Sequence, residues 1–309
     1  MAKKFDLAKY KESINVAQVP FKEDKLIPIS PALQAITGLQ GLPLGHVVQI
    51  YGPSNGGKSS LAYYLAKEAQ GVGVTPIFVT TEGKVDYTRM EKMGIDLDNM
   101  IGDTAEFLED LFGRLDKYVS DQATGELPMD ILLIVDSIGN TISRDSVTIN
   151  KDGTSEIGGA MMKAAKVVRE RMRIMSHKIN NTRKVNSKFS AGLVFINHSY
   201  KTPPQFPGGP TLDTPYGGDG IYYASSLVIK VRKQKVLKAS KDGTDITFGL
   251  VSKLAVEKNH INGISNEGVF VITPDAIIAN EAGAINEYKT AHKSSWGTFT
   301  TDDGEVIDE

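Results

Sequence analysis

From about residue 30 to residue 271, short hydrophobic runs alternate with stretches in which apolar residues recur every three or four positions. The short runs are typical of buried strands, and the longer periodic stretches are typical of helices packed on a sheet. The predicted strands are Val47–Tyr51, Ile77–Thr81, Ile131–Asp136, Leu193–Ile196, Leu227–Val231 and Phe248–Val256. This order predicts an α/β fold with a mostly parallel, twisted sheet flanked by helices.

A helix is predicted over Met161–Ile179, because its apolar residues repeat at spacings of three and four. The apolar face carries Met161, Ala165, Val168, Met172, Met175 and Ile179. The other side carries Lys163, Lys166, Arg169 and Arg173. We interpret the methionine-bearing face as a core contact rather than a binding surface.

Two segments, about Ser143 to Gly159 and Ser199 to Gly220, follow neither period and are rich in glycine, proline or polar residues. We expect both to lack regular structure, and loops of this length tend to be functional or disordered. We expect three parts in the chain. Residues 1–29 form a short N-terminal helix and a linker, residues 30–272 form the core, and residues 273–309 form a short extension with an acidic tail.

The distribution of charge along the chain is more informative than the net charge. The net charge is -2, yet ten basic residues and only one acid, Glu170, lie between Lys163 and Lys201, and the segment 301–309 carries only acidic charge. A basic middle with an acidic tail fits a nucleic-acid binder, although two solvated surfaces fit the charge equally well. The chain has no cysteine, which excludes disulfides and thiolate metal sites. It shows no signal-like N-terminus and no apolar run of about 20 residues, so we expect a soluble, cytoplasmic protein without membrane contact.

The strongest chemical signal lies between the first predicted strand and a helix. The segment reads Gly52, Pro53, Ser54, Asn55, Gly56, Gly57, Lys58, Ser59 and Ser60. Its first eight positions satisfy the phosphate-binding loop pattern, and a strand before and a helix after supply the required context. Glycines let successive N–H groups point at phosphate oxygens, Lys58 reaches the β- and γ-phosphates, and the Ser59 hydroxyl binds Mg²⁺. The sequence therefore predicts a nucleoside-triphosphate site.

Other polar residues follow predicted strands. Asp136 ends a buried strand, where a carboxylate of such an enzyme holds Mg²⁺. Glu82 follows another strand and could orient a water molecule against the γ-phosphate. Asp86 and Glu91 are alternative acids that are more typical of surface groups. His198 follows a fourth strand and fits either a γ-phosphate sensor or a histidine hydrogen-bonded in the core.

The ordered set of these motifs resembles the RecA-type recombinases over about residues 25 to 272, and most of all their phage UvsX branch. The resemblance rests on Gly41-Leu42-Pro43-Leu44-Gly45, Glu82 with Met93-Gly94-Ile95-Asp96, Asp136-Ser137-Ile138-Gly139-Asn140, Ile196-Asn197-His198-Ser199-Tyr200, and Gly217-Gly218-Asp219-Gly220-Ile221-Tyr222-Tyr223. It implies a RecA-like ATPase core that binds ATP with Mg²⁺.

The resemblance also implies roles for matching residues. Glu82 is expected to be the catalytic base, Asp136 the magnesium-associated acid and His198 the γ-phosphate sensor. Lys258 is expected to reach the ATP of a neighbouring subunit. The two irregular segments correspond to the DNA-binding loops, and the DNA-contacting candidates in the second are Lys201, Phe206, Gly217 and Gly218.

The chain departs from the family at several positions. His260 stands where RecA has a second lysine, and Arg89 stands where the family often places a tyrosine against the adenine. The stretch Phe5-Asp6-Leu7-Ala8 fits a short polymerisation pattern, but we interpret it rather as the apolar face of an N-terminal helix.

The resemblance predicts an ATP-dependent recombinase that forms a homo-oligomeric filament on single-stranded DNA and pairs it with duplex DNA. Single-strand-binding and loader proteins are further expected partners. A ring helicase with the same core, a small-molecule kinase and a non-catalytic mediator are the alternatives.

Overall fold

The structure is a computed structural model that describes residues 6, 9–10, 20–81, 85–149, 155–157, 159–202, 206, 209, 211–241 and 244–292. Its strands are β1 (Leu26–Pro28), β2 (Gly41–Pro43), β3 (Val47–Gly52), β4 (Thr75–Thr80), β5 (Ile101–Thr104), β6 (Ile131–Asp136), β7 (Val147–Ile149), β8 (Ser155–Ile157), β9 (Ala191–Thr202), β10 (Leu212–Pro215), β11 (Leu227–Lys241), β12 (Thr244–Asn259), β13 (Glu267–Ile272) and β14 (Ile277–Ala279). Its longer helices are α2 (Pro31–Thr37), α3 (Lys58–Gly71), α4 (Tyr87–Lys92), α5 (Leu108–Thr124), α6 (Ala160–Asn181), α7 (Asp219–Ala224) and α8 (Ala282–His292).

The main sheet has the strand order β14-β13-β12-β11-β3-β9-β6-β4-β5. Neighbouring strands from β11 to β5 are parallel. The strands β12, β13 and β14 extend the sheet by antiparallel pairs. The predicted α/β fold with a mostly parallel sheet is therefore confirmed. Helices bury both faces of the parallel strands, which explains why these strands are continuous hydrophobic runs in the sequence.

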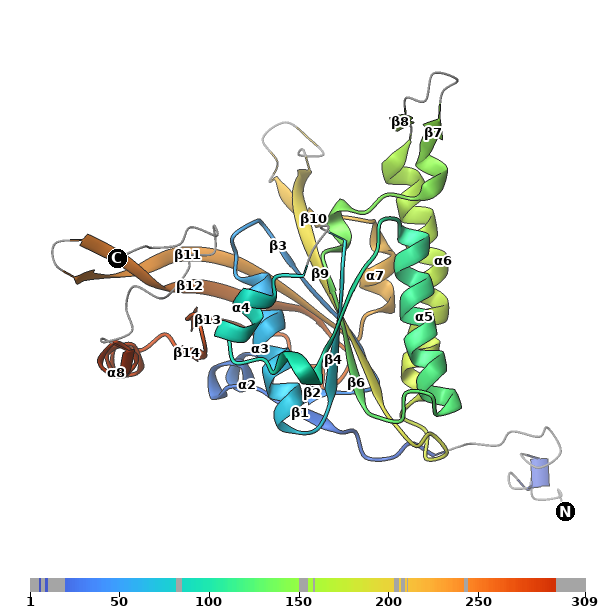
Figure 1. Cartoon of the computed structure of the whole chain (residues 1–309), viewed down its shortest axis with the longest axis horizontal. Coiled ribbons are helices and arrows are strands. Elements are labelled where there is room, and N and C mark those ends of the chain that lie inside the picture. The colour runs from blue at the N-terminus through green and yellow to red at the C-terminus, as the bar shows by residue number, and fades with distance from the viewer. Residues whose placement is uncertain are drawn as a thin grey trace, which may run out of the picture.

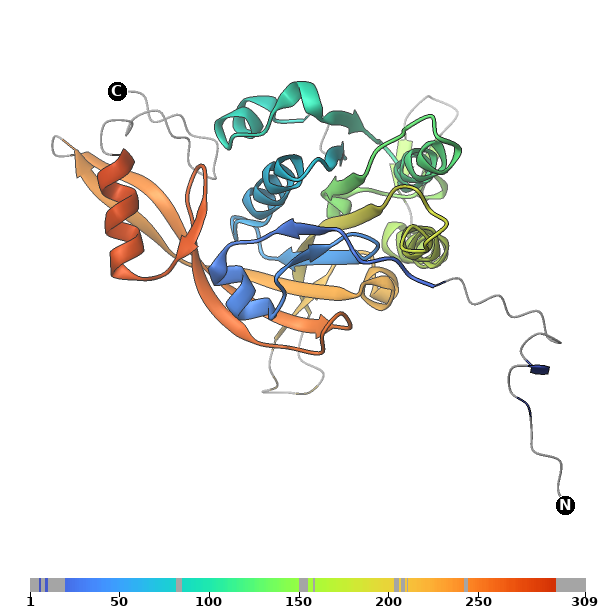
Figure 2. The ribbon, with the colours of Figure 1, turned by 90° about the horizontal axis from the view of Figure 1, so that it is seen from below.

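Two hydrophobic cores lie on opposite faces of the sheet, because successive strand residues point to opposite sides. Val48 and Ile50 of β3 face the core that contains α2, α3 and Met90 of α4. Val47 faces the core that contains α5, α6 and Ile221 of α7. Figures 1 and 2 show these two helical layers on either side of the strands. The sheet is thereby held rigidly at its centre, where the phosphate-loop strand β3 lies.

The predicted helix over 161–179 is present as α6, but the prediction that its apolar face is buried was wrong at the first residue, Met161. Val168, Met172, Met175 and Ile179 are buried, whereas Met161 is 55% exposed. The first turn of α6 lies beyond the end of the main sheet and next to β7 and β8 (Figure 1), so the main sheet does not cover it.

Both segments that were expected to be irregular contain β-hairpins, so that expectation was wrong for their described residues. In the first, β7 pairs antiparallel with β8. In the second, the end of β9 pairs with β10, which places Leu212 opposite Thr202. The strands β7, β8 and β10 are only three or four residues long and contain no continuous apolar run, which is why the sequence pattern missed them. The two hairpins project from the same side of the molecule (Figure 1).

The strands β11 and β12 are also much longer than predicted. They pair with each other from Leu227 opposite Asn259 to Lys241 opposite Thr244. The parallel neighbour β3 accompanies β11 only as far as Lys230. On its other side, β12 pairs with β13 as far as Leu250, which lies opposite Val236. Beyond this point β11 and β12 form a two-stranded ribbon that leaves the sheet (Figure 1), and the lysine-rich sequence of β11 lacks the hydrophobic signal of a buried strand.

The chain after β13 forms β14 and α8. Tyr288 of α8 is buried, donates a hydrogen bond of 2.7 Å to Asp275 and stacks on Phe248 of β12. No helix among the described residues is long and apolar enough to cross a membrane. Most of the predicted N-terminal helix and the whole acidic tail lie outside the described residues.

Candidate nucleotide-binding site

The backbone of the phosphate-loop segment has the geometry that only glycine tolerates at two positions. Gly52 has φ 154°, and a Cβ atom there would lie 2.0 Å from the carbonyl oxygen of Val231. Gly57 has φ 89°, and its Cβ atom would lie 2.1 Å from a methyl group of Ile272. Asn55 also has positive φ, at 57°. Where a residue of positive φ adjoins ordinary backbone, successive N–H groups turn toward one point, which is an anion-binding arrangement.

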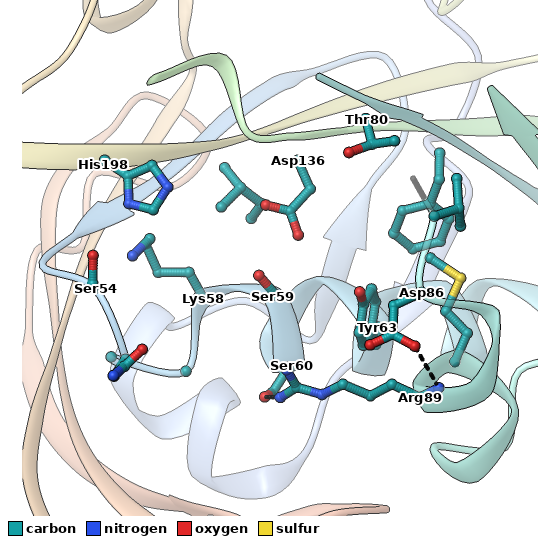
Figure 3. Close-up of a pocket in the computed structure, with 17 residues that line it drawn as sticks. Ser54, Lys58, Ser59, Ser60, Tyr63, Thr80, Asp86, Arg89, Asp136 and His198 are labelled. Carbon is teal, nitrogen blue, oxygen red and sulfur yellow. Dashed lines mark hydrogen bonds between the residues drawn. The ribbon is translucent and has the colours of Figure 1, made fainter. Parts of the chain in front are cut away.

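The loop borders a cleft of about 390 Å³ (Figure 3), a size that suits a small-molecule ligand. Its lining residues include Ser54, Asn55, Gly56, Gly57, Lys58, Ser59 and Ser60 from the loop and the start of α3. Gly52 and Pro53 are predicted loop residues outside this lining. Lys58 is only 5% exposed, and its ammonium donates a hydrogen bond of 2.7 Å to the carbonyl oxygen of Pro53. The cation is therefore held at the loop itself.

Strand register brings the remaining polar residues to the same edge of the sheet. Gly52 of β3 lies opposite His198 of β9, and Thr80 of β4 lies opposite Asp136 of β6. All these strands are parallel, so their carboxyl ends meet at one edge, where open α/β sheets bind ligands. Thr80, Asp136 and His198 all line the cleft.

The donors at the centre of the cleft fit Mg²⁺. Asp136 and Ser59 face each other across the cleft in Figure 3. One hydroxyl and one carboxylate are a small donor set, but Mg²⁺ usually completes its shell with water and substrate phosphates. No group of three or more histidine or carboxylate side chains that could hold a metal by itself occurs in the described residues. The arrangement therefore favours a metal that arrives with a phosphate ligand.

The other end of the cleft contains residues that the sequence patterns did not single out. Tyr63 of α3 and Met90 of α4 line it together with Asp86 and Arg89. The Arg89 guanidinium donates a 2.7 Å hydrogen bond to the Ser60 hydroxyl and lies 5.6 Å from the centre of the Tyr63 ring. Asp86 caps α4 by accepting from the Arg89 backbone N–H at 3.1 Å. Tyr63 and Met90 carried no signal, because they are apolar residues at helical spacing.

Of the predicted catalytic residues, one lies outside the described residues and another lies away from this cleft. Glu82 lies outside the described residues, which end at Thr81 and resume at Val85. Lys258 of β12 is not part of the lining and donates hydrogen bonds of 2.8 and 3.1 Å to the carbonyl oxygens of Tyr222 and Tyr223. Burial lowers the pKa of Lys258 below its usual value.

The candidate DNA-contacting residues belong to the β9–β10 hairpin and the turn after it. Lys201 and Phe206 are exposed, at 76% for the lysine side chain and 63% for the phenylalanine. Gly217 and Gly218 have φ values of 82° and 71° and pack close to α6. These glycines allow the chain to turn from β10 into α7.

The hairpin is hydrogen-bonded to the strand that carries His198. The backbone N–H of Tyr216 donates to the carbonyl oxygen of His198 at 3.0 Å. The Asn197 amide donates to the carbonyl oxygen of Tyr216 at 2.8 Å. His198, whose side chain lines the cleft, and its neighbour Asn197 are thus both hydrogen-bonded to Tyr216 at the end of the hairpin.

Comparison with known proteins places this arrangement in a family. The model of the RecA N-terminal domain family matches residues 21–273. Protein RecA of Mycolicibacterium vanbaalenii is 28% identical over 282 residues, which cover 90% of this chain and 73% of that protein. Protein RecA of Heliobacterium modesticaldum is 27% identical over 286 residues, with 84% and 72% covered. These matches confirm the resemblance to RecA-type recombinases, and the chain therefore belongs to the RecA family of ATP-binding, DNA-dependent ATPases.

Proposed function

We propose that this chain is a recombinase of the UvsX type, which uses Mg²⁺ and ATP to assemble as a helical filament on single-stranded DNA. The filament pairs the bound strand with a homologous duplex and exchanges strands. Lys58 contacts the β- and γ-phosphates, and Ser59 and Asp136 hold Mg²⁺. Glu82 orients the attacking water molecule, and His198 contacts the γ-phosphate.

The observation that carries this proposal is the direct link between the cleft and the β9–β10 hairpin. His198 lines the cleft, and its carbonyl oxygen accepts the N–H of Tyr216 at the end of the hairpin. A ligand that moves His198 therefore also acts on the segment that carries Lys201 and Phe206. A lysine suits a DNA phosphate, and an exposed aromatic ring suits stacking on a base. A small-molecule kinase does not require this link.

The position of Lys258 supports the assembly of several copies of this chain. This residue lies away from the cleft of its own chain, so we propose that it approaches the ATP of a neighbouring subunit, as an arginine finger does. The same residue could serve a ring as well as a filament. Single-strand-binding and loader proteins are proposed partners of the DNA-bound form.

The test is ATP hydrolysis with and without single-stranded DNA, by the wild type, Lys58→Ala and Lys67→Ala. Lys67 lies on the same helix α3 and donates to the carbonyl oxygen of Asp275, so it is a matched control outside the cleft. We expect strong stimulation by DNA in the wild type and the control, and loss of hydrolysis in Lys58→Ala. Hydrolysis that is indifferent to DNA would contradict the proposal. Electron micrographs with DNA distinguish a filament from a ring.

A further inference from the structure

Asp213 of β10 is a nearly buried carboxylate surrounded by three cations. Its side chain is 6% exposed, and β-pairing places it opposite Lys201. Its oxygens lie 3.8 Å from the Lys201 ammonium and 3.4 Å from the Lys230 ammonium, and it also accepts a hydrogen bond from the Arg232 guanidinium. A buried charge requires paired partners, so these cations stabilise the folded hairpin.

The three cations differ in how firmly they are held. Lys230 is 14% exposed, lies 3.8 Å from Glu257 and lies over the ring of Tyr51. Tyr51 in turn donates a 2.6 Å hydrogen bond to Glu257, and burial together with this carboxylate raises its pKa. Lys201 and Arg232 are 76% and 52% exposed. Lys230 is therefore a fixed partner of Asp213, whereas the other two cations face solvent.

We propose that the Asp213 carboxylate occupies the place of a DNA backbone phosphate in the DNA-free chain. A phosphate of single-stranded DNA displaces it from Lys201 and Arg232, and Lys230 then neutralises Asp213 alone. Carboxylate and phosphate present similar oxygens to an arginine fork and a lysine, so one anion can replace the other without rebuilding the site. This inference rests on the proposed function, since it requires the β9–β10 hairpin to contact DNA.

Replacement of the Asp213 carboxylate by a DNA phosphate is expected to affect the nucleotide cleft. Asp213 lies three residues before Tyr216, whose N–H is bonded to the carbonyl oxygen of His198. Lys230 lies opposite Tyr51, the residue that precedes Gly52 of the phosphate loop. Two hydrogen-bonded routes thus connect the Asp213 cluster to the cleft. A change in the ion pairs of Asp213 alters the position of β10, and coupling of this kind is reciprocal between DNA and nucleotide.

The first test is Asp213→Asn, measured by binding of a fluorescent oligothymidylate in the presence of a non-hydrolysable ATP analogue. Loss of two exposed ion pairs that compete with DNA predicts about 3- to 10-fold tighter binding. We also expect DNA-free ATP hydrolysis to rise and its stimulation by DNA to fall. The matched control is Asp245→Asn on β12. It removes the carboxylate that lies 3.6 Å from the Lys238 ammonium of β11, and it changes the net charge by the same amount. The control is expected to leave affinity within about twofold of the wild type.

A second comparison separates competition from a general effect on the fold. In an Arg232→Gln background, Asp213→Asn should tighten binding by only about two- to threefold, because Lys201 is then the one contested cation that remains. Arg232→Gln alone leaves Asp213 paired with Lys230 and should reduce the log–log salt slope of binding by about 0.7. An equal gain in both backgrounds, or an unchanged salt slope, overturns the inference.

Failure of the inference can be distinguished from failure of the proposed function. If the wild type binds single-stranded DNA and its hydrolysis is stimulated by DNA, but Asp213→Asn shows no gain in affinity, only the inference fails. If the wild type does not bind single-stranded DNA, the proposed function fails with it.

Discussion

The two edges of the parallel sheet are built in different ways. At the carboxyl ends of the strands, the backbone turns through positive φ at Gly57, and polar residues such as Asp136 and His198 face an open cleft. At the amino ends, the residues just before the strands are engaged in contacts within the chain. Asp130, before β6, accepts from the Lys25 ammonium at 2.9 Å and from the Ser190 N–H at 2.6 Å.

The linker before β1 closes the amino edge further. Arg183 binds Asp24 through two hydrogen bonds of 2.8 and 2.9 Å and lies over the ring of Phe21. Gly45 has φ 85°, and a Cβ atom there would lie 2.0 Å from the Arg183 side chain. The polar groups of this edge pair with one another outside the nucleotide cleft, whereas those of the other edge line the cleft. The comparison teaches that substitutions at the carboxyl edge should change activity, and those at the amino edge should change stability.

Lys258 would be an exception to this division, because it lies near the amino edge and yet is proposed to affect activity. Its substitution has the largest expected effect on hydrolysis. Its strand neighbour is Val228, the second residue of β11, so it lies toward the amino ends. If it completes the site of a neighbouring subunit, Lys258→Ala should slow DNA-stimulated hydrolysis about 1000-fold while each chain still binds nucleotide. Lys258→Arg keeps the charge and should retain part of the activity.

Mixing two inactive variants provides the control for that prediction. Chains with Lys258→Ala keep an intact cleft, and chains with Lys58→Ala keep Lys258. Some hydrolysis should return in the mixture, because one variant supplies the lysine to the other. A mixture as inactive as its components would show that Lys258 acts within its own chain.

Asp24→Ala tests the amino edge itself. It removes two hydrogen bonds to a charged and partly buried arginine, and we expect it to lower the free energy of unfolding by about 2 kcal/mol. Hydrolysis by the folded protein should not change. The matched control is Asp121→Ala, which removes an exposed pair with Lys117 four residues away on α5 and should cost at most about 0.5 kcal/mol. Urea denaturation measures both, and equal losses would contradict the assigned difference between the two pairs.

The same division marks what the sequence could predict. The strands β3, β4 and β6 and the phosphate loop are specified locally, by apolar runs and by glycines whose conformation no other residue tolerates. The family resemblance identified His198 as a sensor, and the residue does line the cleft. The position of Glu82 stays a prediction, because it lies outside the described residues.

Features formed by residues far apart in the chain could not be predicted in this way. The ion pairs of Asp213 join β10 to β11, and the contacts of Arg183 join the end of α6 to the linker before β1. Neither pairing follows any local period. The hairpins β9–β10 and β11–β12 were missed or shortened for the same reason, since cross-strand pairing decides strand structure in polar segments.

His198→Ala sharpens the comparison at the carboxyl edge. In the wild type, we expect single-stranded DNA to bind about 10-fold more tightly with an ATP analogue than with ADP, which is a typical coupling between two sites. The alanine variant should reduce this ratio to near one, because the side chain that we propose to contact the γ-phosphate is gone. The backbone contact with Tyr216 remains, so stability should change little. A retained ratio would show that the nucleotide state reaches the hairpin by another route.

His46 gives the smallest effect and tests the amino edge through pH. Its ring nitrogens lie 3.0 Å from the Ser226 hydroxyl and 3.6 Å from Asp24. Burial, followed by the nearby Arg183 charge, holds the pKa of His46 below its usual 6.5, although Asp24 opposes this. The unfolded chain therefore takes up this proton at a higher pH than the folded chain does. Stability is fully present above about pH 6.5 and falls as the pH drops through the folded pKa.

Replacing His46 by glutamine removes this proton uptake from the unfolded state. Between pH 7.5 and 5.5, the free energy of unfolding of the wild type should fall more than that of His46→Gln, because only in the wild type does the unfolded chain take up a proton at this position. Urea denaturation at the two pH values measures the difference. Hydrolysis per folded chain should show no matching difference, because His46 precedes β3 at the edge opposite the cleft. An acid loss of activity that tracks His46 while stability stays constant would mean that the two edges are coupled through β3.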